Sequence, residues 1–477
     1  MTTASMVIDG RGVATDDAFD VVDPATERVI GRAPSCRPAQ LDDAFEAASR
    51  AFDTWREDDG ARQAMLAAAA DRIDEASEEL GQLLTSEQGK PITEARDEVR
   101  YAAMWLRYHA HLALPRDILA DDENGFTEVR HRPMGVVAAI TPWNYPVNLA
   151  MWKIAPALRT GNTMVLKPSP YTPLTTLRMA EIMQADLPPG VLNVVTGPDP
   201  LGAQMVEHPV PRKISFTGST AAGRKVFAAA APTLKRITLE LGGNDAAVVL
   251  PDADPAAIAE SLFWGAFMNN GQVCLAAKRV YVHESQRDAL AEAMAAVVSR
   301  APMGIGSDPE TKFGPINNRM QYDKVSELVA DALARGATAV TGGAPVEGPG
   351  WFYPATILTD VDDGVRVVDE EQFGPVLPLV AYRDVEEAVE RANRGDFGLT
   401  ASVWSPDIDR ATEVSTRLEV GAVSINQHAG AIGPHLPFAG HRSSGVGVEN
   451  GIWGLRSYTE TQAFVRPPLT AHPTERN

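Results

Sequence analysis

Short, almost entirely apolar runs recur along the chain, and glycine or proline bounds each of them. The first five are GVVAAITP, NTMVLKPS, VLNVVTG, RKISFTG and DAAVVLPD. A half-exposed strand alternates polar and apolar residues, whereas continuous runs suit parallel strands that are buried on both faces. Amphipathic stretches such as DKVSELVADALARG alternate with them, with apolar residues at three- and four-residue spacing. We therefore predict an α/β protein with doubly wound sheets.

The length of 477 residues predicts more than one hydrophobic core. A second series of strand-like runs begins after about residue 245 and includes KRVYVHES, PVLPLVAY and TASVWS. It predicts a second α/β domain. The segment DILADDENGFTEVRHRP, at about 117–133, is typical of an exposed hairpin or arm, as is the tail after RSYTETQAF.

Composition excludes several classes of partner. A formal net charge of −20 would repel the phosphates of nucleic acid. The first residues, MTTASMVIDGRG, lack the basic start and apolar run of a signal peptide, and no stretch of the sequence approaches a membrane span. Two cysteines far apart cannot form a disulfide framework. We therefore expect a cytoplasmic protein without nucleic-acid or membrane partners.

One of the two cysteines, Cys274, lies in the segment NNGQVCLAAKRVYVH. The Asn-Asn-Gly-Gln before it and the strand-like run Arg279–Val282 after it place the thiol near a bend, between a helix and a strand. A free cysteine is commonly a small buried hydrophobe. This segment alone therefore leaves both core packing and chemistry open.

Four polar residues follow strand-like runs or occupy sharp turns, where α/β proteins build their sites. They are Asn144 in TPWNYP, Lys167 in VLKPSP, Glu240 in TLELGGN and Glu371 in EEQFGP. Each has a simpler interpretation, as a turn former or a solvated surface charge. A lysine that abuts an apolar strand would need a partner if it were buried.

The segment SFTGSTAAGRKVF reads as a strand, a Gly-rich turn and a helix. Such a turn can offer backbone N–H groups and a helix N-terminus to a phosphate. It matches neither the G-x-G-x-x-G fingerprint nor a P-loop. By itself it is equally compatible with a tight packing turn.

The motifs TPWNYP, KPS, FTGST, LELGGN, GQVC and EEQFGP occur in this order, followed by HLPFAG and SSGVGVENG. Together they resemble the NAD(P)-dependent aldehyde dehydrogenase superfamily over essentially the whole chain. The resemblance implies two doubly wound α/β domains and a small β arm that drives assembly into a homodimer or homotetramer. The implied nucleotide-binding domain covers 1–116 and 134–242, the catalytic domain 243–440, and the oligomerisation arm 117–133 and 459–468.

The resemblance also implies catalytic roles. Cys274 falls where the family carries its nucleophile, which suits a thiolate that forms a thiohemiacetal with an aldehyde. The Asn144 amide and the Cys274 backbone N–H match the oxyanion hole. Glu240 matches the general base that hydrolyses the thioester. Lys153 matches a lysine linked to proton relay, and Glu449 is a further candidate for that path.

The cofactor implied is NAD, and NADP is possibly also accepted. Lys167 would bond the adenosine ribose, Ser219 would contact the pyrophosphate, and Glu371 would hold the nicotinamide ribose. The remaining implied cofactor residues are Ile140, Pro142, Trp143, Gly218, Gly223 and Phe373. Where NAD-preferring members usually carry glutamate, this chain has Pro170, which removes both a ribose acceptor and a charge that repels a 2′-phosphate. Cys36 matches no family site and is interpreted as structural, and no metal is expected.

The residues that match the family's aldehyde channel are apolar or aromatic, with no Arg or Lys among them: Tyr145, Leu149, Trp152, Met268, Val273 and Leu275. A second carboxylate on the substrate would be left unpaired there. We therefore predict medium-chain aliphatic or aromatic aldehydes as substrates.

Three alternatives to oxidation of an aldehyde to its carboxylic acid remain at this stage. A CoA-acylating relative would pass the thioester to CoA, but that branch generally lacks the glutamate matched by Glu240. A catalytically silent binding protein is disfavoured by an intact Cys274, Glu240 and Asn144. A cysteine hydrolase needs a histidine base, and none of the nine histidines lies in a recognisable motif.

Overall fold

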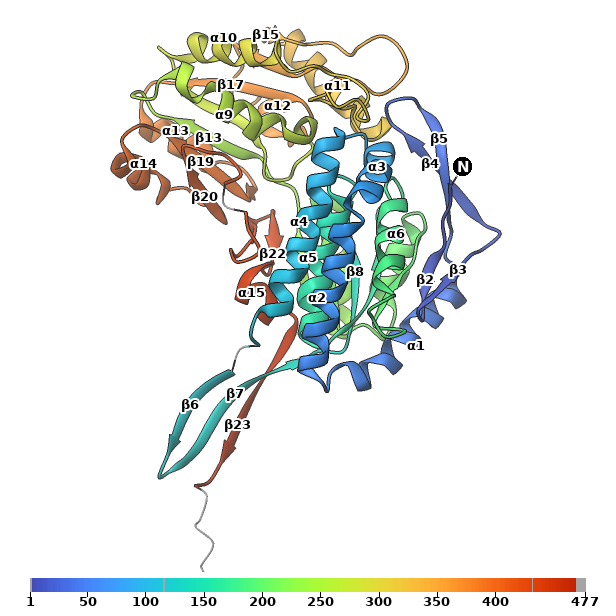
Figure 1. Cartoon of the computed structure of the whole chain (residues 1–477). Coiled ribbons are helices and arrows are strands. Elements are labelled where there is room, and N and C mark those ends of the chain that lie inside the picture. The colour runs from blue at the N-terminus through green and yellow to red at the C-terminus, as the bar shows by residue number, and fades with distance from the viewer. Residues whose placement is uncertain (1, 115, 431, 469–477) are drawn as a thin grey trace, which may run out of the picture.

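A computed structural model describes residues 2–114, 116–430 and 432–468 of the chain. Residues 1 and 115 of the first expected domain and residue 431 of the second lie outside them. Two large sheets form the body, and a narrow three-stranded arm projects from it (Figure 1). The chain is thus a mixed α/β protein with largely parallel sheets, as predicted.

The first sheet has eight strands. Their order is β22 (Gly445–Val446), β12 (Arg236–Glu240), β11 (Lys213–Thr217), β8 (Val136–Ile140), β9 (Thr163–Lys167), β10 (Leu192–Val194), β2 (Met6–Ile8) and β3 (Arg11–Val13). The five from β12 to β10 are parallel, whereas β22, β2 and β3 pair antiparallel at the two edges. Every residue of β8, β9 and β11 is buried, as continuous apolar runs predict.

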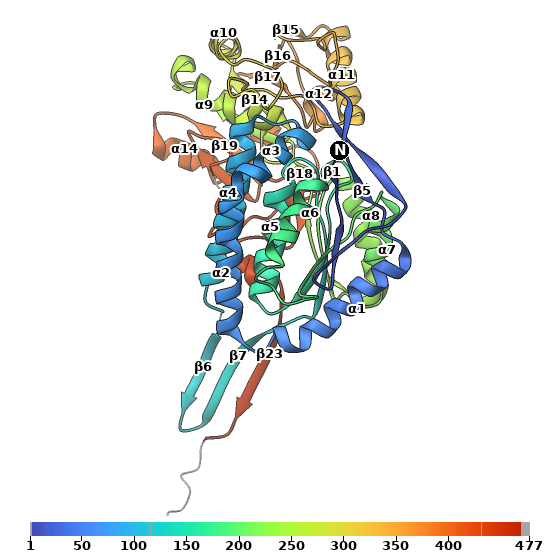
Figure 2. The ribbon, with the colours of Figure 1, turned by 45° about the vertical axis from the view of Figure 1, so that its right-hand side comes forward.

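Helices cover both faces of this sheet. One face packs on α2 (Asp59–Glu75), α3 (Ser77–Gln88), α4 (Ile92–His111), α5 (Pro146–Arg159) and α6 (Leu174–Met183). The other packs on α1 (Pro38–Trp55), α7 (Pro200–Glu207) and α8 (Thr220–Ala230), which Figure 2 shows on the opposite side of the strands. The side chains of β8 alternate between the two apolar clusters because successive strand residues point to opposite faces.

The second sheet has seven strands, all parallel except β15. Their order is β15 (Thr338–Thr341), β16 (Thr356–Thr359), β17 (Val376–Tyr382), β14 (Ala277–His283), β13 (Asp245–Val249), β19 (Thr400–Trp404) and β20 (Ala422–Ile425). The helices α9 (Pro255–Phe267) and α10 (Arg287–Val298) cover one face. On the other lie α11 (Arg319–Ala334), α12 (Arg366–Asp369), α13 (Val385–Asn393) and α14 (Ile408–Ser415).

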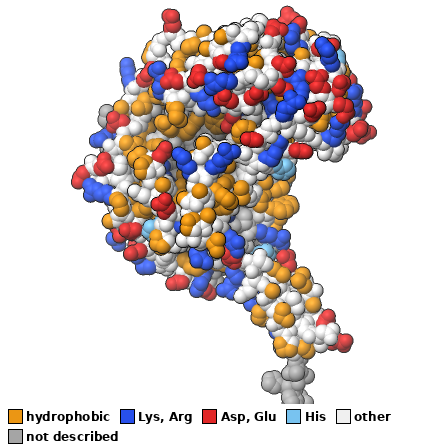
Figure 3. Space-filling view, turned by 180° about the vertical axis from the view of Figure 1, so that it is seen from behind, with side chains coloured by type: hydrophobic (Ala, Val, Ile, Leu, Met, Phe, Trp, Pro, Cys, Tyr) orange, Lys and Arg blue, Asp and Glu red, His pale blue; other side chains and the backbone are white. Residues whose placement is uncertain are grey.

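The arm consists of β6 (Arg116–Asp122), β7 (Gly125–Pro133) and β23 (Thr459–Arg466), paired antiparallel. Figure 3 shows it standing clear of the body, with hydrophobic side chains along its surface. The smaller elements are β1 (Thr2–Thr3), β4 (Ala18–Asp23), β5 (Arg28–Pro34), β18 (Phe397–Gly398), β21 (His441–Arg442), α15 (Gly451–Arg456) and the 3₁₀ helices η1 (Ala231–Thr233) and η2 (Met268–Gly271). None of the helices among the described residues combines the length and apolar character needed to cross a membrane.

Candidate active site

Cys274 follows a tight turn between η2 and β14. Asn269, Asn270 and Gly271 in this turn have positive φ values of 48°, 56° and 72°. Asparagine and glycine tolerate this left-handed backbone better than other residues. A Cβ on Gly271 would collide with the carbonyl oxygen of Gly374, so the position requires glycine. The Asn-Asn-Gly sequence therefore sets the bend, and Cys274 is half-buried just after it.

The electrostatics at Cys274 disfavour the thiolate. Burial raises the pKa of the thiol to about 12, and the carboxyl groups of Asp245, Glu240 and Glu371 add to the rise. The ammonium of Lys278 acts in the opposite direction and lowers the pKa. Because the thiolate is the nucleophilic form, chemistry at Cys274 depends on a base or a positive charge nearby.

Asn144 lies in the turn between β8 and α5, with its side chain buried. Its Nδ2 donates to the carbonyl oxygen of Gln272 at 2.9 Å, two residues before Cys274. The backbone carbonyl oxygen of Asn144 accepts from Lys90 Nζ at 2.9 Å and from Asn269 Nδ2 at 3.0 Å. A primary amide has two N–H donors. The bond to Gln272 fixes the amide and leaves the second donor for an oxygen bound beside the thiol.

Glu240 ends β12 and is only 3% exposed, and neither of its carboxylate oxygens has a hydrogen-bond partner among the described residues. Burial raises its pKa well above the ordinary value, Glu449 adds to the rise, and Lys153 opposes it. Lys153 Nζ contacts Glu449 Oε1 at 2.6 Å, and both side chains are fully buried. Ser215 Oγ donates to the same oxygen at 3.3 Å. An unpaired acid therefore sits beside a buried lysine–glutamate pair.

An apolar cluster adjoins the thiol and contains four of the six residues expected in the aldehyde channel. These are Leu149, Trp152, Val273 and Leu275. Tyr145 packs against the same cluster, as Cys274 does. Trp152 stacks on Trp105 with ring centroids 5.6 Å apart and meets Phe438 edge-on at 5.3 Å. Met268 is half-buried and is not part of this cluster.

The first group of expected cofactor residues lies at the carboxyl ends of β9 and β11. Lys167 is buried, and its Nζ donates to the Pro168 carbonyl oxygen at 3.5 Å. Burial lowers the pKa of Lys167 to about 8. Ser219 is exposed and caps α8. A Cβ on Gly223 would collide with the Leu241 side chain, so glycine lets α8 lie close to the sheet. A buried ammonium beside an open helix N-terminus fits the ribose and phosphates of a dinucleotide.

The second group joins the two sheets. Phe373 precedes β17 and meets Trp143, which follows β8, edge-on at 5.4 Å between ring centroids. Glu371 Oε1 accepts the backbone N–H of Gly243 at 3.0 Å. Ile140 ends β8, half-buried Pro142 precedes Trp143, and the N–H of Gly218 donates to the carbonyl oxygen of Glu240 at 3.0 Å.

Sequence reasoning missed several buried polar residues around the site. Lys90 and Glu98 form a fully buried ion pair at 2.5 Å, and Glu98 also accepts the N–H groups of Val147 and Asn148 at the start of α5. Lys278 is buried against the turn that holds Cys274. A lysine followed by Glu94 and Glu98 at four-residue spacing was a usable signal in GKPITEARDE. Lys278, one residue before an arginine in AAKRV, gave none.

Two largely parallel sheets meet beside a cysteine, and one of them carries a Gly-rich strand-to-helix turn, an arrangement typical of a dinucleotide-dependent oxidoreductase. The family model for the aldehyde dehydrogenase family matches residues 13–464. The chain belongs to this family, and it is an aldehyde dehydrogenase that uses NAD. This confirms the resemblance seen in the ordered motifs.

Curated relatives support the assignment over nearly the full length. The chain is 40% identical to aldehyde dehydrogenase LUC3 from Fusarium sp over 97% of this chain and 98% of the relative. It is 40% identical to the mitochondrial succinate-semialdehyde dehydrogenase of Arabidopsis thaliana, over 96% and 88% of the two chains. It is 38% identical to phenylacetaldehyde dehydrogenase from Pseudomonas fluorescens, over 96% and 95%.

Solved structures of similar proteins share the fold. The NAD⁺ complex of an aldehyde dehydrogenase from Bacillus cereus matches with a TM-score of 0.94 and 34% identity, covering 98% of this chain and 97% of the other. An NADP-dependent enzyme from E. coli matches with a TM-score of 0.94 and 36% identity, covering 98% of each chain.

Proposed function

We propose that the enzyme oxidises medium-chain aliphatic or aromatic aldehydes to carboxylic acids through a thioester on Cys274. The net reaction is RCHO + NAD⁺ + H₂O → RCOO⁻ + NADH + 2 H⁺. The observation that carries the proposal is Glu240, a buried carboxyl group whose two oxygens have no hydrogen-bond partner in the described part of the chain. Burial, with a contribution from Glu240, raises the pKa of the nearby Cys274 thiol. Such a carboxyl group is costly to bury and is typical of a functional site.

Cys274, after its thiol proton has passed to solvent, would attack the aldehyde carbon through Sγ, and the carbonyl oxygen would become an oxyanion. The second N–H of Asn144 Nδ2 and the backbone N–H of Cys274 would donate to that oxyanion. When bound, NAD supplies a hydride acceptor for the C–H bond of this tetrahedral centre. Collapse of the centre leaves an acyl thioester on Cys274.

Glu240 would then remove a proton from the water that attacks the thioester carbon, and the C–S bond would break to release the acid. A raised pKa suits this role because a base must hold the proton it takes. The adjoining Lys153–Glu449 pair would pass the proton on. Glu240 must be ionised to act, so the rate of thioester hydrolysis should rise with pH.

Two variants test this division of labour. Cys274→Ala should abolish oxidation while NAD binding stays nearly intact. Glu240→Gln should give a burst of NADH followed by poor turnover, because acylation precedes the step that needs the base. Full steady-state activity in either variant would overturn the assignment. The Glu240→Gln result also separates hydrolysis from acyl transfer to CoA, since CoA would restore turnover only in an acyl-transferring enzyme.

The substrate proposal rests on the apolar cluster beside Cys274. Lys90 is the ammonium nearest to Tyr145, 3.7 Å from its ring centroid, but it is already paired with Glu98. A dicarboxylic semialdehyde would leave its carboxylate buried and unpaired, at a cost of several kcal/mol. We therefore expect kcat/KM for phenylacetaldehyde or hexanal to exceed that for succinate semialdehyde. The reverse order would contradict the proposal. Sequence identity does not choose between the two kinds of substrate, because relatives named for each are similar to this chain to nearly the same degree.

We propose that NADP is also accepted, with NAD preferred, because Pro170 follows the ribose-binding Lys167 where a carboxylate would repel a 2′-phosphate. Ser169 between them is buried and uncharged. The charged hydrogen bond lost with such a carboxylate is worth about 1.5–3 kcal/mol to NAD. The test is kcat/KM for both cofactors in the wild type and in Pro170→Glu. Rejection of NADP by about a thousandfold in the wild type would contradict this role of Pro170.

We also propose that the arm drives assembly into a homodimer or homotetramer in the cytoplasm. Ile118, Leu119 and Val465 on the arm are more than half exposed, and apolar patches of this kind mark interfaces. Both cysteines are free, which suits a reducing compartment. Replacement of Leu119 and Val465 by aspartate should shift the mass in light scattering toward the monomer.

A further inference from the structure

Lys278 is a buried ammonium whose three donors are all directed at the turn that carries the nucleophile. Lys278 is only 1% exposed. Nζ donates to the carbonyl oxygens of Val273 at 2.7 Å, Cys274 at 3.1 Å and Ala276 at 3.2 Å. A lysine has three N–H donors and no acceptor. All three therefore bind the backbone around the thiol, and none goes to a side chain.

An irregularity in the sheet directs Lys278 to this position. Asp245 of β13 pairs with Ala277 of β14, and the next residue, Ala246, pairs with Arg279. Lys278 is the extra residue between these two pairs. A bulge of this kind re-aims a side chain and is over-represented beside active sites.

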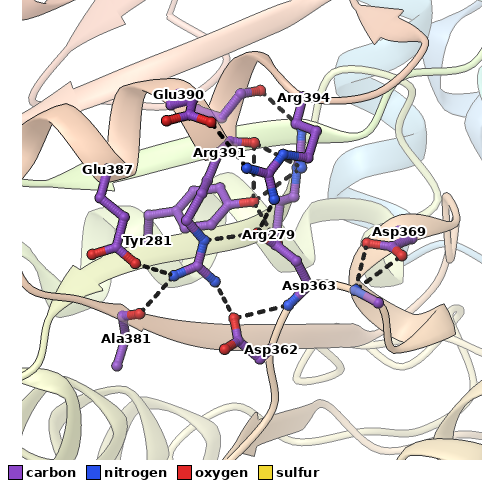
Figure 4. Close-up of polar contacts among 12 residues, drawn as sticks. Arg279, Tyr281, Asp362, Asp363, Asp369, Ala381, Glu387, Glu390, Arg391 and Arg394 are labelled. Atoms are coloured by element: carbon purple, nitrogen blue, oxygen red, sulfur yellow. Dashed lines mark hydrogen bonds and ion pairs between the residues drawn. The ribbon is translucent and has the colours of Figure 1, made fainter.

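The neighbouring cation, Arg279, has other partners. Its guanidinium donates to the carbonyl oxygens of Asn244 at 2.9 Å and Ala392 at 3.0 Å, and to Tyr281 Oη at 3.0 Å. Figure 4 shows it among the charged residues around Arg391, on the α13 side of the sheet. Lys278 is therefore the cation of this strand that serves the nucleophile.

The charge of Lys278 has no carboxylate within salt-bridge distance among the described residues. Asp245 is one candidate for the compensating charge, because burial raises its pKa and the charge of Lys278 opposes the rise. Its carboxylate accepts from Thr400 Oγ1 at 2.6 Å. A Cβ on Gly243 would lie 2.6 Å from Asp245 Oδ1 and 2.8 Å from the Cys274 carbonyl oxygen, so the acid and the nucleophile's backbone adjoin. A buried charge needs a compensating charge, and the thiolate of Cys274 is a second candidate for it.

We propose that Lys278 is a positioning residue for Cys274: its ammonium fixes the nucleophile turn and supplies the positive charge that stabilises the thiolate. The proposal rests on the proposed role of Cys274 as nucleophile. Lys278 touches no reacting atom and acts through the turn and through its field.

The pH dependence follows from the groups that face Cys274. Lys278 lowers the pKa of the thiol, whereas Asp245, Glu240 and Glu371 raise it. Tyr145 also faces the thiol and is kept neutral because burial raises its pKa. Burial raises the pKa of Asp245 to about 7. Asp245 therefore opposes the thiolate only above about pH 7, when it is ionised.

The experiment measures alkylation of Cys274 by iodoacetamide in a Cys36→Ala background, where Cys274 is the only thiol. An opposite charge at about 4–6 Å shifts a pKa by about 1–3 units. A higher thiol pKa leaves less thiolate at a fixed pH but makes that thiolate more nucleophilic, so the alkylation rate falls only about threefold for each unit of pKa. Lys278→Met should therefore slow alkylation by about 3- to 40-fold, and Lys278→Arg, which keeps the charge, should restore most of the rate.

Lys213→Met is the matched control, because Lys213 is equally buried and donates through Nζ to Thr238 Oγ1 at 2.7 Å on the other sheet. It should leave alkylation unchanged. Equal slowing in Lys278→Met and Lys213→Met, or a wild-type rate in folded Lys278→Met, would overturn the proposal.

Asp245→Asn provides a test with the opposite sign, which also holds if Lys278→Met fails to fold. It should speed alkylation about threefold or more at about pH 9 and leave it unchanged at about pH 6, because Asp245 is ionised only at the higher pH. No acceleration at about pH 9 would overturn the electrostatic role. If the wild type formed no NADH with any aldehyde while these alkylation rates held, the proposed function would fail and the inference about Lys278 would stand.

Discussion

The buried pair of Lys90 and Glu98 supports the loop that carries Asn144, and Lys90→Met should destabilise the protein strongly. Methionine keeps the length of the side chain and removes the charge, so Glu98 loses its cation inside the core. Breaking a buried pair by removing one partner costs about 3–5 kcal/mol. Glu98 Oε1 still accepts from the backbone of Val147 at 2.9 Å and Asn148 at 3.2 Å. These donors at a helix N-terminus hold part of the charge, so we expect a loss near 3 kcal/mol.

For a domain of about 150–250 residues, a loss of about 3 kcal/mol should lower the melting temperature by roughly 6–12 °C. Scanning calorimetry at a fixed scan rate measures this difference. The double variant Lys90→Met/Glu98→Gln should recover part of it, because no uncompensated charge remains. The surface pair of Arg178 and Glu79 is the control, since both side chains are over one-third exposed. Arg178→Met should cost at most about 1 kcal/mol.

A melting temperature for Lys90→Met within about 2 °C of the wild type would refute the reasoning, because it would mean that Glu98 is neutral or otherwise satisfied. An equal loss in Arg178→Met would refute it too. Steady-state kinetics provide a second measurement, because Lys90 Nζ also donates to the Asn144 backbone carbonyl oxygen at 2.9 Å. A folded Lys90→Met enzyme should therefore lose kcat more than it raises KM for NAD.

Three further predictions concern the cofactor site and the base. The Lys167 ammonium loses its proton as pH rises through about 8, so KM for NAD should be constant below that pH and rise above it. A KM for NAD that stays constant up to about pH 9.5 would count against the assignment of Lys167 to the cofactor site. Gly223→Val would push α8 away from Leu241 and should raise KM for NAD about tenfold with little change in kcat, whereas Gly60→Ala, which meets only Asp58 Oδ1 at 3.6 Å, should change neither. Burial raises the pKa of Glu240 in the folded state, so the native protein binds more protons than the unfolded chain, and its stability falls as pH rises above the unfolded value of about 4.5. Glu240→Gln should therefore have a higher melting temperature than the wild type, by a margin that grows from about pH 5 to about pH 9. A margin that stays constant over this pH range would contradict the prediction.

Much of the fold could be predicted because the central strands carry their burial in their own residues. The runs that became β8, β9 and β11 are apolar throughout, and all their residues are buried. The edge strands could not be predicted in this way. β2, β3 and β22 have two or three residues each, too few to show a period. β2 and β22 join the sheet through distant partners, and β3 joins it only through its hairpin with β2.

The candidate site divides in the same manner. Cys274, Glu240 and Asn144 could be proposed as site residues because each lies in a motif whose order and spacing are legible along the chain, and their catalytic roles stay predictions. Lys278 could not, because nothing in AAKRV marks this lysine as buried, although its partners lie only two to five residues away. For Lys90, the spacing to Glu98 was a usable signal, but its bond to a carbonyl oxygen 54 residues away comes from the tertiary structure.

The account rests most directly on an acyl thioester at Cys274, and rapid chemical quench of Glu240→Gln with NAD and an aromatic aldehyde tests it. Mass spectrometry of the digested protein should find the acyl group on the peptide that contains Cys274, in step with about one equivalent of NADH per active site. Cys274→Ala should give neither. An NADH burst without an acyl adduct on that peptide, or a burst that persists in Cys274→Ala, would contradict the account.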